Sequence, residues 1–358
     1  MRFRIFIFWR FSLFLLTYIG SFAFPLLNNN GPGSVGPARS FNYLSSWGQW
    51  DGGYYLSIAE NGYKSIENYA FFPLYPLLVS LLGRVINNYL LAGLLISNIL
   101  FFIFLMVFYA FTKQFFSKEI AKIASITFLF FPTAFFGTAM YSESLFLLLT
   151  VLTFYFLYKK NYFLSSIFGG LSVITRSVGI FLGLSIIYSA IVKKPKALIK
   201  NLIWSTLPFL AVFFYMLYLK AKTGDPFIFL NVQNLWQRSF VDPVSSLISG
   251  LFTLVTSQKP IMDYLDFALT VLFITLLIIG RKKIPSSLWV FSMLAILFPV
   301  STGTLSSMPR YLLASIGTFI IIADFLKSKP QIMYVVWAVS LILQIFLAVR
   351  FINGYWAS

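Results

Sequence analysis

Charged side chains at the edges of long apolar segments are the residues of this sequence with the clearest chemical potential. The 358 residues include no cysteine and no histidine, which excludes thiol and imidazole chemistry and leaves proton transfer to carboxylates, tyrosines or lysines. Asp51, in WGQWDGGYYLSIAENGY, is the first candidate. At the start of a helix expected over residues 50–60 it would be held ionised and could act as a general base toward a hydroxyl. Helix capping is the structural alternative for Asp51.

Aromatic residues surround this carboxylate. Trp50, Tyr54 and Ile58 are spaced at i, i+4 and i+8, which predicts an apolar stripe along a helix lying on the membrane surface. Trp50 and Tyr54 would suit the face of a sugar, although such residues also line any membrane interface. We predict that both contact substrate together with Glu60, which would also be a second choice as base.

A second acidic candidate lies at a turn between two apolar segments. Glu143, in TAMYSESLF, is accompanied by Tyr141, Ser142 and Ser144, a set that could position an acceptor hydroxyl. Helix capping explains Glu143 almost as well. We therefore expect Glu143 to assist Asp51 in catalysis, with capping as the open alternative.

Two arginines are placed where a lipid phosphate would lie. Arg176 is midway through an apolar stretch that has lysines at both ends, so it must sit at the bend of a helical pair. Arg310, in SSMPRYLL, opens a later apolar segment. Arginine is well suited to phosphate, and we predict that both bind the phosphate of a donor. For Arg176 the alternative is snorkelling to the interface or pairing with an acid.

A long polar stretch carries the remaining candidates. In KTGDPFIFLNVQNLWQR, a turn at residues 224–226 is followed by a short aromatic amphipathic helix. We predict that Asp225, Trp236 and Arg238 contact substrate, although a turn followed by an interfacial helix explains this composition adequately.

The elements that position these residues are membrane helices. Apolar residues make up 59% of the chain and charged residues 10%, and the mean hydropathy is +0.84, so we predict an all-α polytopic membrane protein. A spanning helix needs about 20 apolar residues, and eleven segments qualify or come close. They cover residues 11–27, 89–112, 121–138, 143–158, 161–174, 177–192, 199–219, 264–280, 285–302, 311–326 and 331–351.

The distribution of charge predicts a cytoplasmic N-terminus. In that orientation 17 of the 27 basic residues share the cytoplasmic side with only Glu119 and Asp324 among the ten acids. The resulting asymmetry is typical of membrane proteins and accounts for the net charge of +17. A nucleic-acid partner is not expected, because no basic stripe is interleaved with aromatics. The basic start could also belong to a signal peptide, but no small-x-small site follows, so we expect an uncleaved helix.

The same topology predicts two large extracytoplasmic loops within a single domain over residues 1–358. The first covers residues 28–88 and the second residues 220–263. The apolar run at residues 73–86 is expected to lie at the outer surface, since a spanning helix there would invert the charge asymmetry. The active site would then face the extracytoplasmic side, at the plasma membrane if the source is prokaryotic.

The quoted motifs also carry a resemblance. WDGGYYLSIAENGY, AFFPLYPLL, YSESLF, TRSVG, TGDPFIFLNVQNLW and PRYLL, over roughly residues 45–315, resemble in order and spacing the PIG-V-type mannosyltransferases. That resemblance implies a GT-C membrane glycosyltransferase with a polyprenyl-phosphate sugar donor, usually mannose. By that match Asp51 would be the catalytic carboxylate, Arg176 and Arg310 would bind the donor phosphate, and Glu143 and Asp225 would support them. Eukaryotic relatives act in glycosyl-phosphatidylinositol assembly.

Both arguments predict transfer of a sugar from the lipid phosphate to a lipid-linked or glycan acceptor hydroxyl, with inversion by single displacement. No Asp-x-Asp pair is present, so we expect no cofactor and no metal site, with a divalent metal as the open alternative. A transporter or flippase of lipid-linked sugars is the alternative function. A structural subunit with a degenerate site is a third.

Overall fold

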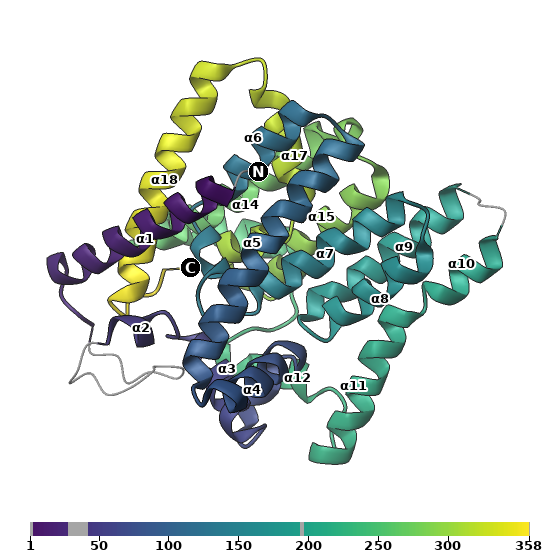
Figure 1. Ribbon diagram of the computed structural model, residues 1–358, viewed down its shortest axis with the longest axis horizontal. Coiled ribbons are helices and arrows are strands. Elements are labelled where there is room, and N and C mark those ends of the chain that lie inside the picture. The colour runs from purple at the N-terminus through teal and green to yellow at the C-terminus, as the bar shows by residue number, and fades with distance from the viewer. Residues whose placement is uncertain (1–2, 28–41, 194–196, 358) are drawn as a thin grey trace. The chain divides into compact units, whose positions relative to one another are not determined.

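The computed structural model of this protein describes residues 3–27, 42–193 and 197–357, and every regular element in those ranges is a helix (Figure 1). The all-α prediction is confirmed. The chain divides into two compact units. The first comprises Met1–Asn68, Tyr75–Leu145 and Leu326–Ser358, and the second comprises Tyr69–Leu74 and Phe146–Phe325.

The first unit is built mainly from four long or buried helices. In chain order its elements are α1 (Phe3–Ala23), α2 (Tyr43–Ser46), α3 (Asp51–Asn61), η1 (Ile66–Ala70), α4 (Leu74–Ile86), α5 (Tyr89–Phe115), α6 (Lys118–Leu129), η2 (Ala134–Gly137) and α18 (Pro330–Ile352). Helix α1 packs on α18, and α5 packs on α6. Buried Gln344 of α18 joins these pairs: it accepts a hydrogen bond from Trp9 Nε1 (2.8 Å) and donates to the carbonyls of Leu129 (3.0 Å) and Phe131 (2.7 Å).

Helix α1 begins at Phe3, eight residues before the predicted segment, and therefore contains Arg10. A half-buried arginine inside an apolar helix needs partners for its inner polar atoms. Arg10 Nε donates to Asn98 Oδ1 of α5 (2.8 Å), and its guanidinium lies 4.4 Å from the centroid of the Trp47 ring. These contacts allow the helix to continue through a charged residue, and they attach α1 to the segment that leads to Asp51.

The second unit is a larger helical assembly. Its elements are α7 (Glu143–Tyr158), whose first three residues belong to the first unit, α8 (Tyr162–Val173), η3 (Ser177–Gly179), α9 (Ile180–Lys193), α10 (Leu198–Trp204), α11 (Leu207–Thr223), α12 (Ile228–Asn231), η4 (Val232–Trp236), α13 (Pro243–Thr256), α14 (Ile261–Ile279), η5 (Arg281–Lys283), α15 (Ser286–Val300), α16 (Met308–Leu312) and α17 (Ile316–Leu326). Helix α8 packs on α9 and α11, α9 on α15, and α14 on α13, α15 and α16. Lys283 and Asp324 form an ion pair of 2.8 Å.

Among the described residues, five helices are long and apolar enough to cross a bilayer: Arg4–Ala23, Tyr89–Phe115, Leu198–Thr223, Ile261–Ile279 and Pro330–Ile352. Every one of the eleven predicted segments contains a helix, but the others have fewer than 18 residues or are interrupted. The polytopic class is therefore confirmed, whereas the number of eleven spans stays a prediction.

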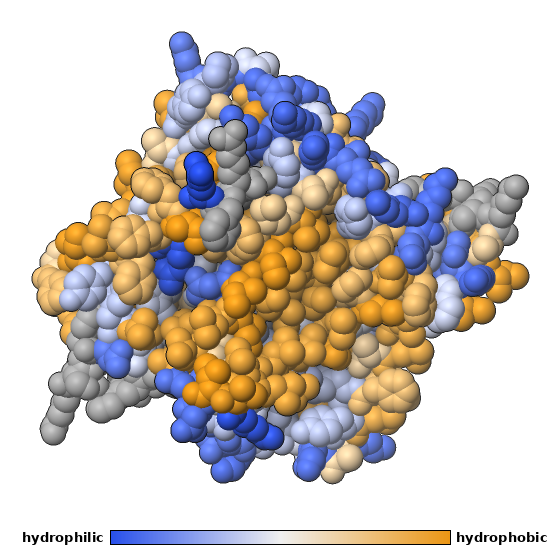
Figure 2. Space-filling view, viewed as in Figure 1, coloured by the Kyte–Doolittle hydropathy of each residue, from blue (hydrophilic) through white to orange (hydrophobic). Residues whose placement is uncertain are grey.

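Helix α5 shows how such a helix is suited to lipid. Its exposed apolar residues are Leu91, Leu95, Ile99, Ile103 and Met106. Their spacing of three or four residues places them on one face, and a continuous apolar face of this length is unfavourable in water but suited to a hydrocarbon environment. Figure 2 shows apolar side chains over most of the visible length of α5.

The two predicted outer loops contain helices. In the first loop, residues 28–41 lie outside the described residues, and the rest forms α2, α3, η1 and α4. Helix α4 covers residues 74–86, where a surface helix was expected. The second loop contains α12 and η4 as expected, and also α13, a 14-residue apolar helix that we did not predict. Asp242 caps α13 by accepting a hydrogen bond from the Ser245 amide (2.9 Å).

Candidate functional site

Asp51 is the first residue of α3 and is partly exposed. The helix begins there because Trp50 has a φ of 58°, which does not continue a helix. This conformation strains a residue other than glycine, and such strain is found preferentially at functional sites. The Trp50 ring packs edge-on against Trp356, with centroids 5.0 Å apart. Asp51 is therefore presented at a helix N-terminus, where the dipole favours its negative charge.

The segment that leads to Asp51 is fixed by hydrogen bonds. The Met140 amide donates to the Trp47 carbonyl (3.0 Å), and the Tyr141 hydroxyl donates to the Gln49 carbonyl (2.9 Å). The Gln49 side chain donates to the carbonyl of Ile352 (3.0 Å). Partners from two parts of the first unit, the turn at residues 140–141 and the end of α18, thus fix the backbone just before Asp51, as the position of a catalytic group requires.

The predicted apolar stripe on this helix is wrong. Trp50 lies outside α3, and Tyr54 is only partly buried. The buried face is formed instead by Gly52, Tyr55, Ile58 and Ala59. A methyl group at Gly52 would be 3.3 Å from the Met140 carbonyl, so the absence of a side chain lets α3 approach this turn closely. Helix α3 therefore packs on protein through that face, and its predicted position at a membrane surface stays a prediction.

Tyr54 lies close to two carboxylates. Burial, and then the negative charges of Glu67 and Asp51, raise the pKa of Tyr54 to about 12. The Tyr54 hydroxyl therefore stays protonated at neutral pH and can donate a hydrogen bond beside Asp51. Glu67 was not among the predicted site residues.

Glu143 is the first residue of α7 and is 3% exposed. Buried hydroxyl groups surround it. Ser142 Oγ lies 2.7 Å from the Tyr55 hydroxyl of α3, and the Tyr75 hydroxyl of α4 lies 2.8 Å from Ser97 Oγ. The charge of Glu143 also acts on Tyr75. Glu143 thus lies near buried hydroxyl pairs, one of which includes Tyr55 of α3, and its contribution to catalysis stays a prediction.

Glu60 lies at the other end of α3, where it is exposed. It lies nine positions after Asp51, which corresponds to about 13 Å along a helix. The structure therefore does not bring Glu60 to the same place as Asp51.

Arg176 lies at the bend between α8 and α9, as predicted. Its amide donates to the Ser172 carbonyl (3.0 Å), and its carbonyl accepts from the Gly179 amide (2.9 Å). The Leu74 amide donates to the Ile174 carbonyl at the same bend (3.0 Å). Backbone hydrogen bonds therefore fix the position of Arg176.

The second unit brings three arginines to one tyrosine ring. The guanidinium carbons of Arg176, Arg238 and Arg310 lie 5.7, 5.5 and 5.4 Å from the centroid of the Tyr311 ring. We call these four residues the arginine cluster. No two of the guanidinium carbons can be more than about 11 Å apart, the sum of two such distances. Like charges this close repel each other, so the cluster is a strong candidate for binding an anion.

The arginines come from different parts of the second unit and are held firmly. Arg238 Nη1 donates to Thr302 Oγ1 (3.0 Å), and its Nη2 donates to the Ser306 carbonyl (3.0 Å). Arg310 is 6% exposed within α16. The two arginines predicted to bind the donor phosphate are thus brought together, and Arg238, predicted only as a substrate contact, joins them.

Asp225 and Trp236 have clear structural partners. Asp225 Oδ1 accepts from the Phe227 amide (2.8 Å), and its Oδ2 accepts from Asn231 Nδ2 (2.7 Å), so this carboxylate closes the turn before α12. The Trp236 ring packs edge-on against Phe71, with centroids 6.4 Å apart. Their predicted contacts with substrate stay predictions.

The Phe-Phe-Pro motif is also structural. Phe72 is buried in an apolar cluster with Tyr215, Leu219 and Phe229. Its ring centroid lies 4.9 Å from that of Tyr215 and 5.5 Å from that of Phe229. This motif therefore joins the segment of residues 69–74 to α11 and α12 in the second unit.

A metal site is not apparent from clustering of ligands. Within the described ranges no three carboxylates lie together as a candidate cation site.

Tyr311 is the residue of the arginine cluster that sequence reasoning missed. Its signal was weak, because one aromatic directly after Arg310 does not show that two distant arginines will reach the same ring.

Comparisons with known proteins agree with these motifs. Residues 4–229 match the family model described as Mannosyltransferase (PIG-V). GPI mannosyltransferase 2 of Cryptococcus neoformans is 30% identical over 156 residues, which are 40% of this chain and 36% of that protein. GPI mannosyltransferase 2 of Schizosaccharomyces pombe is 30% identical over 142 residues, 38% of this chain and 30% of that protein. The matched region thus spans about a third of the length of these relatives.

A solved structure shares the fold. ArnT from Cupriavidus metallidurans, solved bound to undecaprenyl phosphate, has a TM-score of 0.53 and 12% identity over 89% of this chain and 59% of ArnT. The likeness confirms the predicted GT-C-like fold. Because the family model covers well over half of the residues, this chain belongs to the PIG-V mannosyltransferase family.

Proposed function

We propose that this protein is a membrane glycosyltransferase that moves a sugar, mannose by its family, from a polyprenyl-phosphate donor to a hydroxyl of a lipid-linked or glycan acceptor. The observation that carries the proposal is the arginine cluster, in which three guanidinium groups surround Tyr311. Its chemistry suits the phosphate of a lipid donor. The undecaprenyl phosphate bound by ArnT and the names of the curated relatives support the same class of donor and sugar.

In the proposed reaction Asp51 removes the proton of the acceptor hydroxyl as the oxygen attacks the anomeric carbon. A new carbon–oxygen bond forms, and the bond from the anomeric carbon to the phosphate oxygen breaks. The electron pair of that bond leaves with the polyprenyl phosphate, whose charge Arg176, Arg238 and Arg310 stabilise. One displacement inverts the configuration at the anomeric carbon.

The chemistry of the leaving group reduces the need for a general acid or a metal ion. A phosphate leaves as an anion of low basicity, so positive charge is more useful to it than a proton donor. We propose that the arginine cluster supplies this charge and that catalysis needs no metal. The orientation with the N-terminus in the cytoplasm and the reaction on the extracytoplasmic side of a multi-pass protein belongs to the same proposal, supported by the charge asymmetry.

The test is a transfer assay with the full chain in proteoliposomes, given polyprenyl-phosphate mannose labelled in the sugar and a lipid extract from the source cells. We expect the label to pass into a product that resists mild acid, because glycosyl phosphates are cleaved by mild acid and ordinary glycosides are not. Arg310→Gln should slow this transfer by about tenfold or more through loss of a charge at the phosphate. Label that crosses the bilayer while still on the donor would instead identify a transporter and contradict the proposal.

A further inference from the structure

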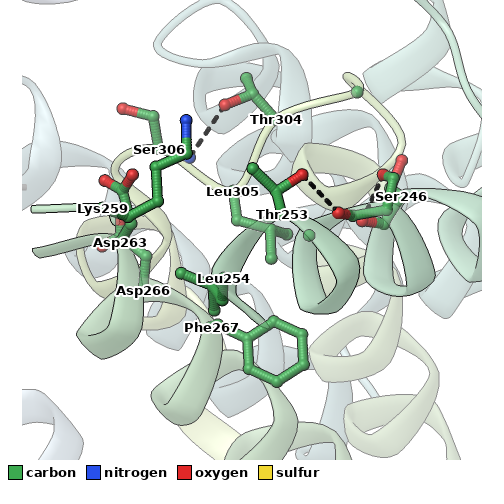
Figure 3. Close-up of a pocket in the computed structure, with 13 residues that line it drawn as sticks. Ser246, Thr253, Leu254, Lys259, Asp263, Asp266, Phe267, Thr304, Leu305 and Ser306 are labelled. Carbon is green, nitrogen blue, oxygen red and sulfur yellow. Dashed lines mark hydrogen bonds between the residues drawn. The ribbon is translucent and has the colours of Figure 1, made fainter. Parts of the chain in front are cut away.

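A cavity of about 310 Å³ opens in the second unit between α13, α14 and the segment of residues 303–306 (Figure 3). Its volume is at the low end of the range for small-molecule sites, which suits a group the size of one sugar ring. The polar side chains of its wall are those of Ser246, Ser249, Thr253, Lys259, Asp263, Asp266, Thr304 and Ser306.

Two buried polar groups in this wall have no hydrogen-bond partner among the described residues. They are Asp266 Oδ1 and Ser246 Oγ, on residues that are 3% and 2% exposed. A buried polar atom without a partner is costly, and a carboxylate oxygen more so than a hydroxyl. Since both residues line the same cavity, a ligand that brings hydroxyl groups would satisfy both atoms.

The other side chains of the wall are consistent with a neutral polyol. Ser249, Thr253 and Ser306 bring hydroxyl groups, whereas Phe267 and Leu305 offer apolar surface to the carbon–hydrogen face of a ring. Gly250 helps to keep the space open, because a methyl group there would lie 3.0 Å from Leu305 Cδ1. The wall holds two carboxyl groups, those of Asp263 and Asp266, against one cationic side chain, that of Lys259, so it suits the phosphate less well than the arginine cluster does.

The cavity adjoins the arginine cluster. Ser306 lines the cavity, and its carbonyl accepts the hydrogen bond from Arg238 Nη2. Arg238 and Asp266 also attract one another electrostatically. A phosphate held by Arg238 would therefore have its covalently attached sugar within reach of this cavity.

We propose that the cavity is the subsite for the neutral hexose of the donor, with Asp266 and Ser246 accepting and donating hydrogen bonds to the sugar hydroxyls. This inference rests on the proposed function and adds to it residues that determine sugar specificity, none of which the sequence motifs indicated. Asp266 is a binding residue here and takes no proton in the reaction.

The experiment measures binding of two probes, polyprenyl phosphate and polyprenyl-phosphate mannose, to the full chain in nanodiscs. We expect the wild type to bind the mannosyl lipid more tightly. Asp266→Asn should lower the affinity for the mannosyl lipid by about tenfold. It should leave the affinity for polyprenyl phosphate within about twofold of the wild-type value, because only the sugar contacts change. Glu119→Gln, which removes an exposed carboxylate of α6, is the matched control and should change neither affinity.

Other outcomes separate the inference from the proposed function. The inference would be overturned if Asp266→Asn bound the mannosyl lipid as tightly as the wild type does. It would also be overturned if the wild type bound an amino-sugar lipid more tightly than the mannosyl lipid. Arg310→Gln should lower the affinity for both probes, so this variant tests the proposed function independently of the sugar subsite. Binding of neither probe by the wild type would overturn both. If Asp266→Asn fails to fold, Ser246→Ala serves as the second variant and should reduce the preference for the mannosyl lipid in the same direction.

Discussion

At the scale of single residues, the site depends on how three positive charges are held around one ring. Each contact between a guanidinium and an aromatic face contributes about 0.5–1 kcal/mol, which offsets part of the repulsion among the arginines. Arg238 gains two further hydrogen bonds from Thr302 and Ser306. Tyr311 is thus the element common to all three charges, although it has no charge itself.

Tyr311 should therefore behave as a positioning residue. We expect Tyr311→Leu to weaken binding of polyprenyl phosphate by about tenfold, because three cation–π contacts are lost together. Tyr311→Phe keeps the ring and should bind within about threefold of the wild type. Titration of each variant in nanodiscs provides the measurement. Equal loss in both variants would show that the hydroxyl, and not the ring, matters.

The proposed role of the arginines also predicts how the reaction responds to chelators. With three guanidinium groups at the phosphate, transfer should change by less than about twofold when EDTA is added to the purified protein. The readout is the initial rate of mannose transfer before and after EDTA, with added Mg²⁺ or Mn²⁺ as the comparison. A rate that falls with EDTA and recovers with one cation would assign charge stabilisation to a metal.

At the scale of elements, the bend between α8 and α9 determines where Arg176 lies. Sequence reasoning located this bend, because lysines at both ends of an apolar stretch require a turn at its middle. It did not indicate how tightly the bend is built: a methyl group on Gly179 would lie 2.6 Å from backbone atoms of Ser172 and Val173. Backbone atoms cannot rotate away, so the bend requires a glycine there.

Gly179→Ala should therefore lower the free energy of unfolding by about 1–3 kcal/mol, and with it the unfolding temperature. It should also reduce binding of polyprenyl phosphate. Gly170→Ala, in the preceding helix, is the matched control. Its added methyl group would meet its nearest atom at 3.6 Å, an ordinary contact. Thermal unfolding in detergent and lipid titration compare the two variants. Similar behaviour of both would indicate that the bend tolerates displacement.

Other elements show where sequence reasoning stops. Helix α3 was expected and its start lies within one residue of the prediction, but its buried face was not, because Trp50 lies outside the helix and the side-chain-free Gly52 packs closely on Met140. Helix α13 was missed because it lies in a stretch treated as one loop. The cavity beside it is lined by residues far apart in the chain, such as Ser246 and Ser306, and no local sequence pattern reveals that they lie around one space.

At the scale of the whole molecule, hydropathy and charge predicted the class of fold well. Eleven apolar segments all contain helices, since burial of apolar surface and satisfaction of backbone hydrogen bonds leave few alternatives in lipid. The number of crossings is harder to predict, because helices such as α6 and α17, with 12 and 11 residues, are shorter than a bilayer requires.

The chain has no cysteine, so its orientation can be tested with single cysteines and no change of background. With a cytoplasmic N-terminus, Lys118→Cys should be protected from an impermeant maleimide in intact cells, whereas Asn61→Cys should be labelled. Both positions are exposed on the protein. Labelling after cell lysis shows that Lys118→Cys is reactive. Labelling of Lys118→Cys in intact cells would reverse the proposed orientation.

The most direct test of the central claim compares mannose transfer by the wild type and by Asp51→Asn, with donor binding measured on the same samples. The asparagine keeps the size of the side chain but cannot take a proton at neutral pH. We predict that the rate of transfer falls by about a hundredfold or more while the affinity for polyprenyl-phosphate mannose changes by less than about twofold. Transfer at the wild-type rate by Asp51→Asn would contradict the account and place the base elsewhere.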